Sequence, residues 1–307
     1  MPNLPEIPGA VLIMKGDAVI ADVTSPGITA YTRFQLASVS KQFTAAAVLL
    51  QAQRGRLRLD DPVGRWIGGC PPSWQDITLH HLLAHSSGLG HWDDYPMIDL
   101  FRWVPLDELL RTFQEVPPLF SPGGGWHYSS PGYVLLAHVA ELVADTPYRE
   151  LLERDIFGPL GLADTFAGEP GDRADLAVGL GEDGLPTPSY ELDVVGMGAG
   201  DIWSTTGDVL RWIDGLRAGR LLDEHHLGLM LSEQAPTGGD PHASGYGYGW
   251  VLGTVDGRPW FHHSGGNAGF RTYDACVPSS GHRIVILGNC ERTTAADLSD
   301  LLLLALT

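Results

Sequence analysis

Strand-like segments at both ends of the chain, with helical patterns between them, constrain the fold more than any other feature. Apolar runs typical of strands cover residues 10–14, 18–23, 248–255, 259–263, 269–277 and 283–287. Helical patterns cover 79–85, 106–113, 132–142, 147–155 and 207–216, and another closes the chain at 294–306. We therefore predict an α+β protein in which one antiparallel sheet, flanked by helices, is built from both chain ends. Segments 1–59 and 224–307 would form this sheet, with a mainly helical region at 60–223 inserted between them and a pocket at the junction.

Composition argues against several classes of partner. The chain has 307 residues, 44% of them apolar, and a formal net charge of −18, which disfavours nucleic acids and anionic membrane surfaces. Three widely separated cysteines indicate neither a disulfide framework nor a metal motif. No stretch has the length of a membrane span. Because residues 1–6 lack the features of a signal peptide, we expect a cytoplasmic protein. No cofactor is indicated, and the oligomeric state is not predicted.

The most specific local motif is Ser38-Val39-Ser40-Lys41, which places a hydroxyl and an amine three residues apart. Only two of the 19 Lys and Arg residues are lysines, and the other, Lys15, lies in a predicted hairpin turn. An arginine would supply positive charge but cannot lose its proton, whereas a desolvated lysine can. The lysine at position 41 therefore indicates that a deprotonatable amine is required.

The surroundings of this motif favour a catalytic interpretation. Residues 43–52 are apolar nearly all round, which is typical of a buried helix, and Gly55 follows its end. Ser38 would lie at the N-terminus of this helix, where backbone N–H groups favour developing negative charge. Lys41 would lie one turn along on the same face, partly desolvated, with a lowered pKa.

Two further clusters contain residues suited to acyl transfer. One is Tyr128-Ser129-Ser130, in a Gly/Pro-rich loop before a helix, and the other is the run 261–270, which contains His263. Taken alone, a Tyr-Ser-Ser before a helix is more often a cap, and a His-Ser-Gly-Gly run is more often a turn.

In this order and at these separations, the three motifs resemble those of the class C β-lactamase and D-alanyl-D-alanine carboxypeptidase superfamily. That family has Ser-x-x-Lys, Tyr-x-Asn and Lys/His-Thr/Ser-Gly in the same sequence. Residues 77–89 are similar to its Ile-Thr-x-x-x-Leu-Leu-x-His-x-Ser-Gly-Leu segment, and similar runs extend the resemblance over about residues 8–305. The resemblance implies the fold predicted above.

The resemblance also implies a role for each matching residue. Ser38 would be the acylated nucleophile. Lys41 would be the general base, or would set the field that deprotonates Tyr128, and Tyr128 would carry the proton to the leaving group. His263 would support the Tyr–Lys hydrogen-bond network, and the backbone N–H groups of Ser38 and Gly266 would form the oxyanion hole.

Two residues depart from the family pattern. Ser130 replaces the usual Asn, and His263 stands where many relatives have Lys, so a permanent positive charge is lost at neutral pH. Ser130, Ser264 and Gly265 are the expected substrate-binding residues. Both departures weaken the case for a dedicated β-lactamase.

Three hypotheses of function follow. The first is a serine hydrolase that acts on a small ester or amide, of esterase, peptidase or β-lactamase type. The second is an acyltransferase that passes the same acyl group to a bound amine or alcohol. The third, against which the intact Ser38, Lys41 and Tyr128 argue, is a catalytically silent scaffold or ligand sensor.

A metal site is the remaining alternative for the histidine-rich segment. His81 and His85 are four residues apart and would share one face of a helix, a spacing that suits zinc. No His-Glu-x-x-His motif accompanies them. We therefore predict no metal.

Overall fold

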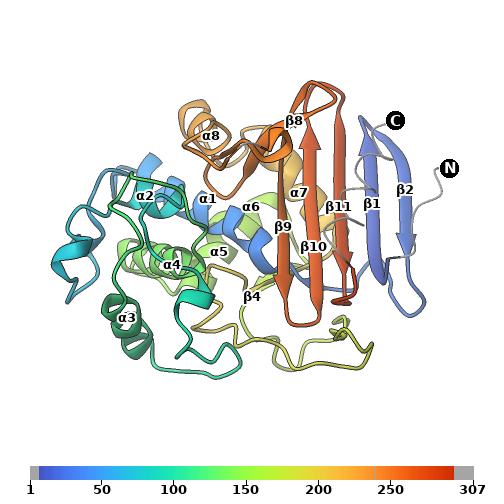
Figure 1. Cartoon of the computed structure of the whole chain (residues 1–307). Helices are drawn as coiled ribbons and strands as arrows, with labels where there is room; N and C mark the ends of the chain where they lie inside the picture. The colour runs from blue at the N-terminus through green and yellow to red at the C-terminus, as the bar shows by residue number, and fades with distance from the viewer. Residues whose placement is uncertain (1–6, 239, 294–307) are drawn as a thin grey trace.

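The computed structural model describes residues 7–238 and 240–293, and an antiparallel sheet of eight strands dominates it (Figure 1). The strand order is β2-β1-β11-β10-β9-β8-β7-β6. The strands span Ala18–Thr24 (β2), Gly9–Lys15 (β1), His282–Gly288 (β11), Phe270–Val277 (β10), Arg258–Asn267 (β9), Val251–Val255 (β8), Gly245–Tyr246 (β7) and Ala235–Pro236 (β6). The predicted α+β class, with a sheet built from both chain ends, is confirmed.

The two ends of the chain meet where β1 pairs with β11. The register runs from Gly9 opposite Gly288 to Lys15 opposite His282. Successive side chains of a strand point to opposite faces, and both faces of β11 are buried: Ile284 and Ile286 belong to one apolar cluster, Val285 and Leu287 to another. Burial on both faces explains why this segment is a continuous apolar run in the sequence.

The helices gather mainly on one side of the sheet (Figure 1). They are Ser40–Gln53 (α1), Leu79–Leu83 (α2), Leu106–Glu115 (α3), Ser130–Ala144 (α4), Tyr148–Leu152 (α5), Gly158–Leu160 (α6), Thr206–Arg217 (α7) and Glu224–Met230 (α8). The apolar helix α1 packs against α4, and α7 packs against β1 and β11. No helix in the described residues has the length and apolarity needed to cross a membrane. The helix predicted at 294–306 lies outside the described residues.

A second, small sheet was not predicted from the sequence. Phe34–Gln35 (β3), Ile202–Ser204 (β5) and Phe166–Ala167 (β4) pair in the order β3-β5-β4. Strands of two or three residues are too short to show an alternating pattern. The small sheet helps to position the candidate site because β3 leads directly into the turn that carries Ser38.

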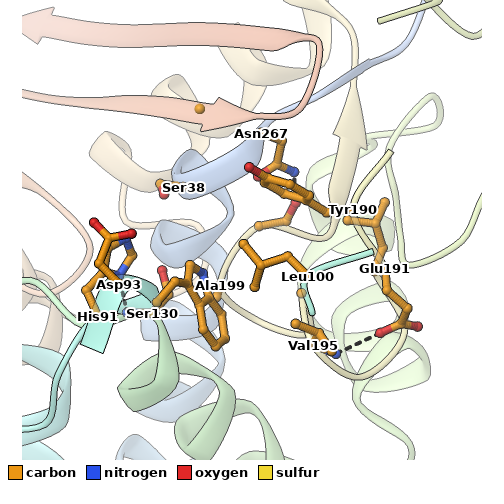
Figure 2. Close-up of a pocket in the computed structure, with 15 residues that line it drawn as sticks. Ser38, His91, Asp93, Leu100, Ser130, Tyr190, Glu191, Val195, Ala199 and Asn267 are labelled. Atoms are coloured by element: carbon orange, nitrogen blue, oxygen red, sulfur yellow. Dashed lines mark hydrogen bonds between the residues drawn. The ribbon is translucent and has the colours of Figure 1, made fainter. Parts of the chain in front are cut away.

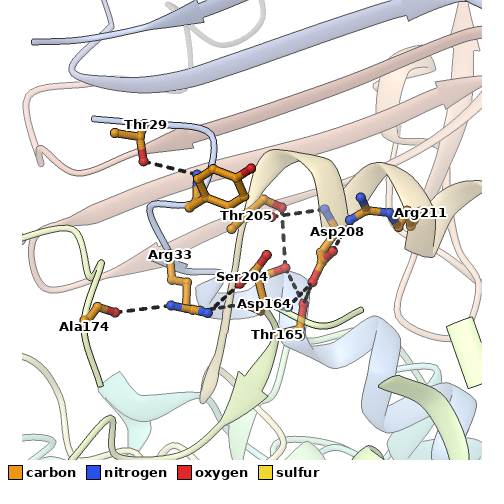
Figure 3. Close-up of polar contacts among 10 residues, drawn as sticks. Thr29, Arg33, Asp164, Thr165, Ala174, Ser204, Thr205, Asp208 and Arg211 are labelled. Carbon is orange, nitrogen blue, oxygen red and sulfur yellow. Dashed lines mark hydrogen bonds and ion pairs between the residues drawn. The ribbon is translucent and has the colours of Figure 1, made fainter. Parts of the chain in front are cut away.

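Asp208 ties this small sheet to α7 (Figure 3). Its fully buried carboxylate accepts hydrogen bonds from the Asp164 N–H at 2.8 Å and from Thr165 Oγ1 at 2.9 Å. Thr205 caps α7 by accepting a hydrogen bond from the Asp208 N–H at 3.2 Å. Arg33, just before β3, pairs with Asp164 at 2.5 Å. These contacts fix the strand that precedes Ser38.

Candidate active site

Ser38 lies in a short 3-10 turn between β3 and α1. Ala37, the residue before it, has a left-handed φ of 48° and is fully buried, a conformation that costs a non-glycine residue energy and is often found at functional sites. β9 lies against this turn: a Cβ on Gly265 would be 2.3 Å from the Leu36 carbonyl oxygen and 3.1 Å from the Ala37 Cβ. Only a glycine in β9 permits this approach. The sheet and the turn that carries Ser38 are therefore in direct contact.

Lys41, in the first turn of α1, is completely buried. Its Nζ donates to the Ala199 carbonyl oxygen at 2.7 Å and to Ser130 Oγ at 3.0 Å, and lies 3.2 Å from Ser38 Oγ. Burial lowers the pKa of Lys41 to about 7. Ser38 Oγ therefore lies within hydrogen-bond distance of a completely buried amine.

The buried carboxylate of Asp201 opposes part of the lowering of the Lys41 pKa. Asp201 is completely buried, and its Oδ1 accepts a hydrogen bond from the Gly198 N–H at 3.0 Å. Its charge raises the pKa of Lys41 against the larger effect of burial. Burial raises the pKa of Asp201 itself to about 7. The titration of Lys41 therefore depends on the state of Asp201.

Two histidines hold the segment that carries Tyr128. His85 Nδ1 accepts a hydrogen bond from the Ser129 N–H at 3.1 Å, and His91 Nδ1 accepts one from the Ser130 N–H at 3.2 Å. The His85 carbonyl oxygen accepts another from the His127 N–H at 2.9 Å. Burial keeps the pKa of His85 well below its usual value and lowers that of His91 to about 4. Both rings are therefore neutral acceptors near pH 7. We call these contacts the histidine clamp.

Tyr128 stands between this clamp and Lys41. Its ring centroid is 4.4 Å from that of His85 and 4.9 Å from Lys41 Nζ. The phenolic oxygen is buried and has no hydrogen-bond partner of good geometry in the described part of the chain. Burial raises the pKa of Tyr128, and the nearby Ser38 hydroxyl opposes the rise only in part. Tyr128 is therefore protonated at neutral pH.

His263 faces the same site from β9, but it does not hydrogen-bond to Tyr128 or Lys41, as the family resemblance implied; its partners are Ser264 and Tyr246. Its Nδ1 is 2.6 Å from the Ser264 carbonyl oxygen, so Nδ1 carries the proton and donates it, and Nε2 accepts from the Tyr246 hydroxyl at 3.0 Å. The ring centroid of Tyr128 is 6.0 Å away. Burial lowers the pKa of His263 to about 3. His263 is thus a neutral link between β9 and Tyr246.

Two pockets meet at Ser38 and Gly266, which line both. The first, the Ser130 pocket, has a volume of about 200 Å³. Figure 2 shows His91, Asp93 and Ser130 on one side of it and Tyr190, Glu191 and Asn267 on the other.

The second, the Tyr128 pocket, has a volume of about 470 Å³ and is lined by Trp126, Tyr128, Tyr246, His263 and Ser264 among others. Of the expected substrate-binding residues, Ser130 and Ser264 line one pocket each, and Gly265 lines neither.

Several residues of the site carried no catalytic expectation from the sequence. His85 was considered only as a possible zinc ligand and as part of the family-like segment 77–89, and nothing marked His91. Tyr246 and Asn267 were also missed. The Asn267 amide donates to Gln35 Oε1 at 2.7 Å and to the Gly200 carbonyl oxygen at 3.0 Å. These partners lie far apart in the sequence, so no local pattern marks them.

The histidine segment does not form the zinc site considered above. Helix α2 ends at Leu83, and His85 has a left-handed φ of 57°, so His81 and His85 do not share a helix face. In the described residues, one group of side chains has metal-ligand spacing: Glu169, Glu191 and Asp193. Their carboxylates already accept backbone N–H groups, for example from Val195 to Glu191 at 2.8 Å.

The fold and the grouping of Ser38, Lys41 and Tyr128 are those expected of a β-lactamase-like serine hydrolase. The family model "Beta-lactamase" matches residues 2–307. The chain is 32% identical to esterase EstB of Burkholderia gladioli over 265 residues, which cover 73% of this chain and 67% of that protein. It therefore belongs to the β-lactamase family of serine hydrolases.

Two further comparisons agree with this assignment. The chain is 29% identical to penicillin-binding protein 4* of Bacillus subtilis (strain 168), over 85% of this chain and 61% of that protein. The crystal structure of a penicillin binding protein from Bacillus halodurans superposes with a TM-score of 0.85 at 26% identity, covering 96% of this chain and 95% of the other. The chain thus spans about three fifths to two thirds of the two curated relatives.

Proposed function

We propose that this chain hydrolyses small esters or amides through an acyl-enzyme on Ser38. The observation that carries the proposal is the geometry of Lys41. A neutral amine has two N–H donors and one lone pair, and the two donors of Nζ are engaged by the Ala199 carbonyl oxygen and Ser130 Oγ. The lone pair is then left for the Ser38 hydroxyl, 3.2 Å away.

The chemistry proceeds in two half-reactions. Lys41 Nζ takes the Ser38 proton while Oγ bonds to the substrate carbonyl carbon, and the N–H groups of Ser38 and Gly266 stabilise the oxyanion. The bond to the leaving group then breaks, and the proton passes through Tyr128 to the departing oxygen or nitrogen. Water attacks the Ser38 ester by the reverse route, which releases the acid and restores the Ser38 hydroxyl.

Lys41, and not Tyr128, is the base that this proposal assigns to acylation. Burial lowers the pKa of Lys41 to about 7, which suits a base near neutral pH. Burial has the opposite effect on Tyr128, because its charged form is the anion, and raises its pKa. A protonated Tyr128 is suited to give a proton to the leaving group. His263 would support this arrangement through Tyr246.

The alternative function is an acyltransferase, and the product of the reaction distinguishes it from a hydrolase: a hydrolase releases the free acid, and a transferase releases a conjugate of the acyl group with an amine or alcohol. Both share the Ser38 ester and differ only in the acceptor. With phenyl acetate as substrate, added amines or alcohols are expected to leave acetate as the main product. Diversion of most of the acyl group into a conjugate would favour the transferase.

Active-site labelling tests the nucleophile. Intact mass after reaction with a fluorophosphonate should show one adduct, which peptide mapping places on Ser38. Ser38→Ala should give no adduct, whereas Ser40→Ala, two residues away, keeps the nucleophile and serves as the matched control. An adduct that persists in Ser38→Ala would refute the proposal.

A further inference from the structure

The Tyr128 pocket is large enough for a substrate fragment and has mainly apolar walls. Its volume of about 470 Å³ lies in the range of small-molecule sites. Three aromatic side chains form a wall: the centroids of Trp126 and Tyr246 are 6.2 Å apart, and that of Tyr128 is 6.4 Å from Tyr246. Val251 and Ala243 add aliphatic surface. Such a wall binds apolar rings and chains.

The position of the pocket identifies which part of the substrate it receives. The reacting carbonyl must lie at Ser38 and Gly266, which line both pockets. Tyr128 lines this pocket only, and Ser130 lines the other only. Because Tyr128 is the group proposed to protonate the leaving group, the leaving group must lie on its side. This step rests on the proposed function.

The charges around the pocket disfavour an anion. Among its described lining residues, the one formal charge at neutral pH is the Asp240 carboxylate, which is exposed. His263 is no cation, because burial lowers its pKa to about 3 and both its nitrogens are hydrogen-bonded.

Two neighbouring basic side chains do not line the pocket either. Arg271 Nη1 would lie 3.6 Å from a Cβ on Gly266, but it donates to the carbonyl oxygens of Asn267 and Phe270 and does not line the pocket. Lys41 does not line it either. A carboxylate placed here would lose water without gaining a cationic partner.

We infer that the Tyr128 pocket selects apolar leaving groups, such as aryl or alkyl alcohols, and rejects those that carry a carboxylate. The wall of Trp126 and Tyr246 supplies the apolar contact, and Asp240 at the rim repels negative charge. The net charge of −18 acts in the same direction over longer range.

Two esters that differ in one charge test the inference. Phenyl acetate and 4-acetoxybenzoate release phenol and 4-hydroxybenzoate from the same acyl group. Their kcat/KM values, each divided by the rate of alkaline hydrolysis to remove intrinsic reactivity, should favour phenyl acetate at least tenfold. A phenyl hemisuccinate, with its carboxylate on the acyl side, locates the effect.

Variants then connect the selectivity to the pocket. Asp240→Asn should reduce the preference for phenyl acetate over 4-acetoxybenzoate about threefold. Ala243→Lys, which adds a cation to the lining, should reduce this preference further. Neither substitution should change the rate for the phenyl hemisuccinate, relative to phenyl acetate, by as large a factor as it changes the rate for 4-acetoxybenzoate. Asp17→Asn removes the same charge from the distant β1–β2 turn and should leave the preference unchanged.

The result that overturns the inference is a normalised preference of one or less, or a preference that neither pocket variant alters. Loss of turnover in Ser38→Ala is measured separately on phenyl acetate. Equal rates for the two esters, in an enzyme that still depends on Ser38, would therefore refute the pocket assignment and leave the proposed hydrolysis intact.

Discussion

At the scale of single residues, the proposed reactivity depends on one lysine, Lys41, whose side chain the fold buries away from water. The shift of the Lys41 pKa from 10.5 to about 7 is large because the whole side chain is buried and Asp201 compensates only in part. An arginine in its place would stay charged, since its pKa is too high for burial to neutralise it. The scarcity of lysine elsewhere in the chain made this residue recognisable in the sequence. Its burial, which the structure shows, explains how it would act.

The pH dependence of acylation follows from this pKa. Below about pH 7 Lys41 is protonated and cannot accept the Ser38 proton, so kcat/KM for phenyl acetate should fall about tenfold per pH unit as the pH decreases. Above that value it should reach a plateau. A profile from pH 5.5 to 9 measures the midpoint.

Asp201→Asn supplies the control for this profile. The amide can still accept the Gly198 N–H, but the charge that raises the Lys41 pKa is gone, so the midpoint should move to lower pH. A midpoint near 10, or one that the substitution leaves in place, would contradict the assignment of Lys41 as base.

Tyr128→Phe tests the residue proposed to protonate the leaving group. Loss of the hydroxyl should lower kcat/KM for an alkyl ester about 100-fold or more, as is typical of a lost general acid. An ester of nitrophenol needs no protonation of its leaving group and should lose much less. Equal losses for both esters would show that Tyr128 does not act on the leaving group.

At the scale of elements, the site is assembled where three unrelated segments meet. The turn before α1 carries Ser38, the loop before α4 carries Tyr128, and β9 carries His263 and Gly266. The histidine clamp holds the second of these segments against residues 85–91, because His85 and His91 accept from consecutive backbone N–H groups of Ser129 and Ser130. Since each lost acceptor would leave an N–H group buried without a partner, the clamp is expected to be costly to break.

The clamp predicts that His85 acts by positioning Tyr128. His85→Ala removes the acceptor of the Ser129 N–H and should lower kcat/KM for an alkyl ester 10- to 100-fold. His85→Asn keeps an acceptor and tolerates the left-handed φ of 57°, so it should restore most of this loss. Fluorophosphonate labelling, which needs Ser38 but little leaving-group protonation, should change less in both variants. Equal activity of the two variants would exclude the hydrogen bond as the cause.

At the scale of the whole molecule, the sequence predicts the long strands and helices better than the contacts between distant segments. The long strands were predictable because burial on both faces of a strand gives a continuous apolar run. The proximity of Ser38 and Lys41 was predictable because residues three apart in a helix lie about one turn from each other. The β3-β5-β4 sheet was too short to detect. The link from Asn267 to Gln35 joins residues 232 positions apart, and no local pattern encodes such a contact. We retain the division into 1–59 with 224–307 and 60–223 as a proposal.

The pairing of β1 with β11, which brings the two ends of the chain together, predicts an effect on stability. Gly9 has a φ of 140°, and a Cβ there would lie 2.0 Å from the Leu287 carbonyl oxygen. Gly9→Ala should therefore destabilise the fold by ~2–4 kcal/mol and lower the thermal midpoint by several degrees. Gly68→Ala, where a Cβ would meet nothing within 4 Å, is the matched control. Equal midpoints for the two variants would contradict the observed pairing of β1 with β11.

The central claim is that a neutral Lys41 activates Ser38, and the rate of acylation in Lys41→Arg tests it most directly. The rate constant for fluorophosphonate labelling at pH 8, followed by intact mass, should fall at least 1,000-fold although the formal charge is kept. Circular dichroism and the thermal midpoint verify that the variant is folded. A folded Lys41→Arg protein that labels Ser38 within tenfold of the parent rate would show that positive charge, and not a free lone pair, is what the site requires.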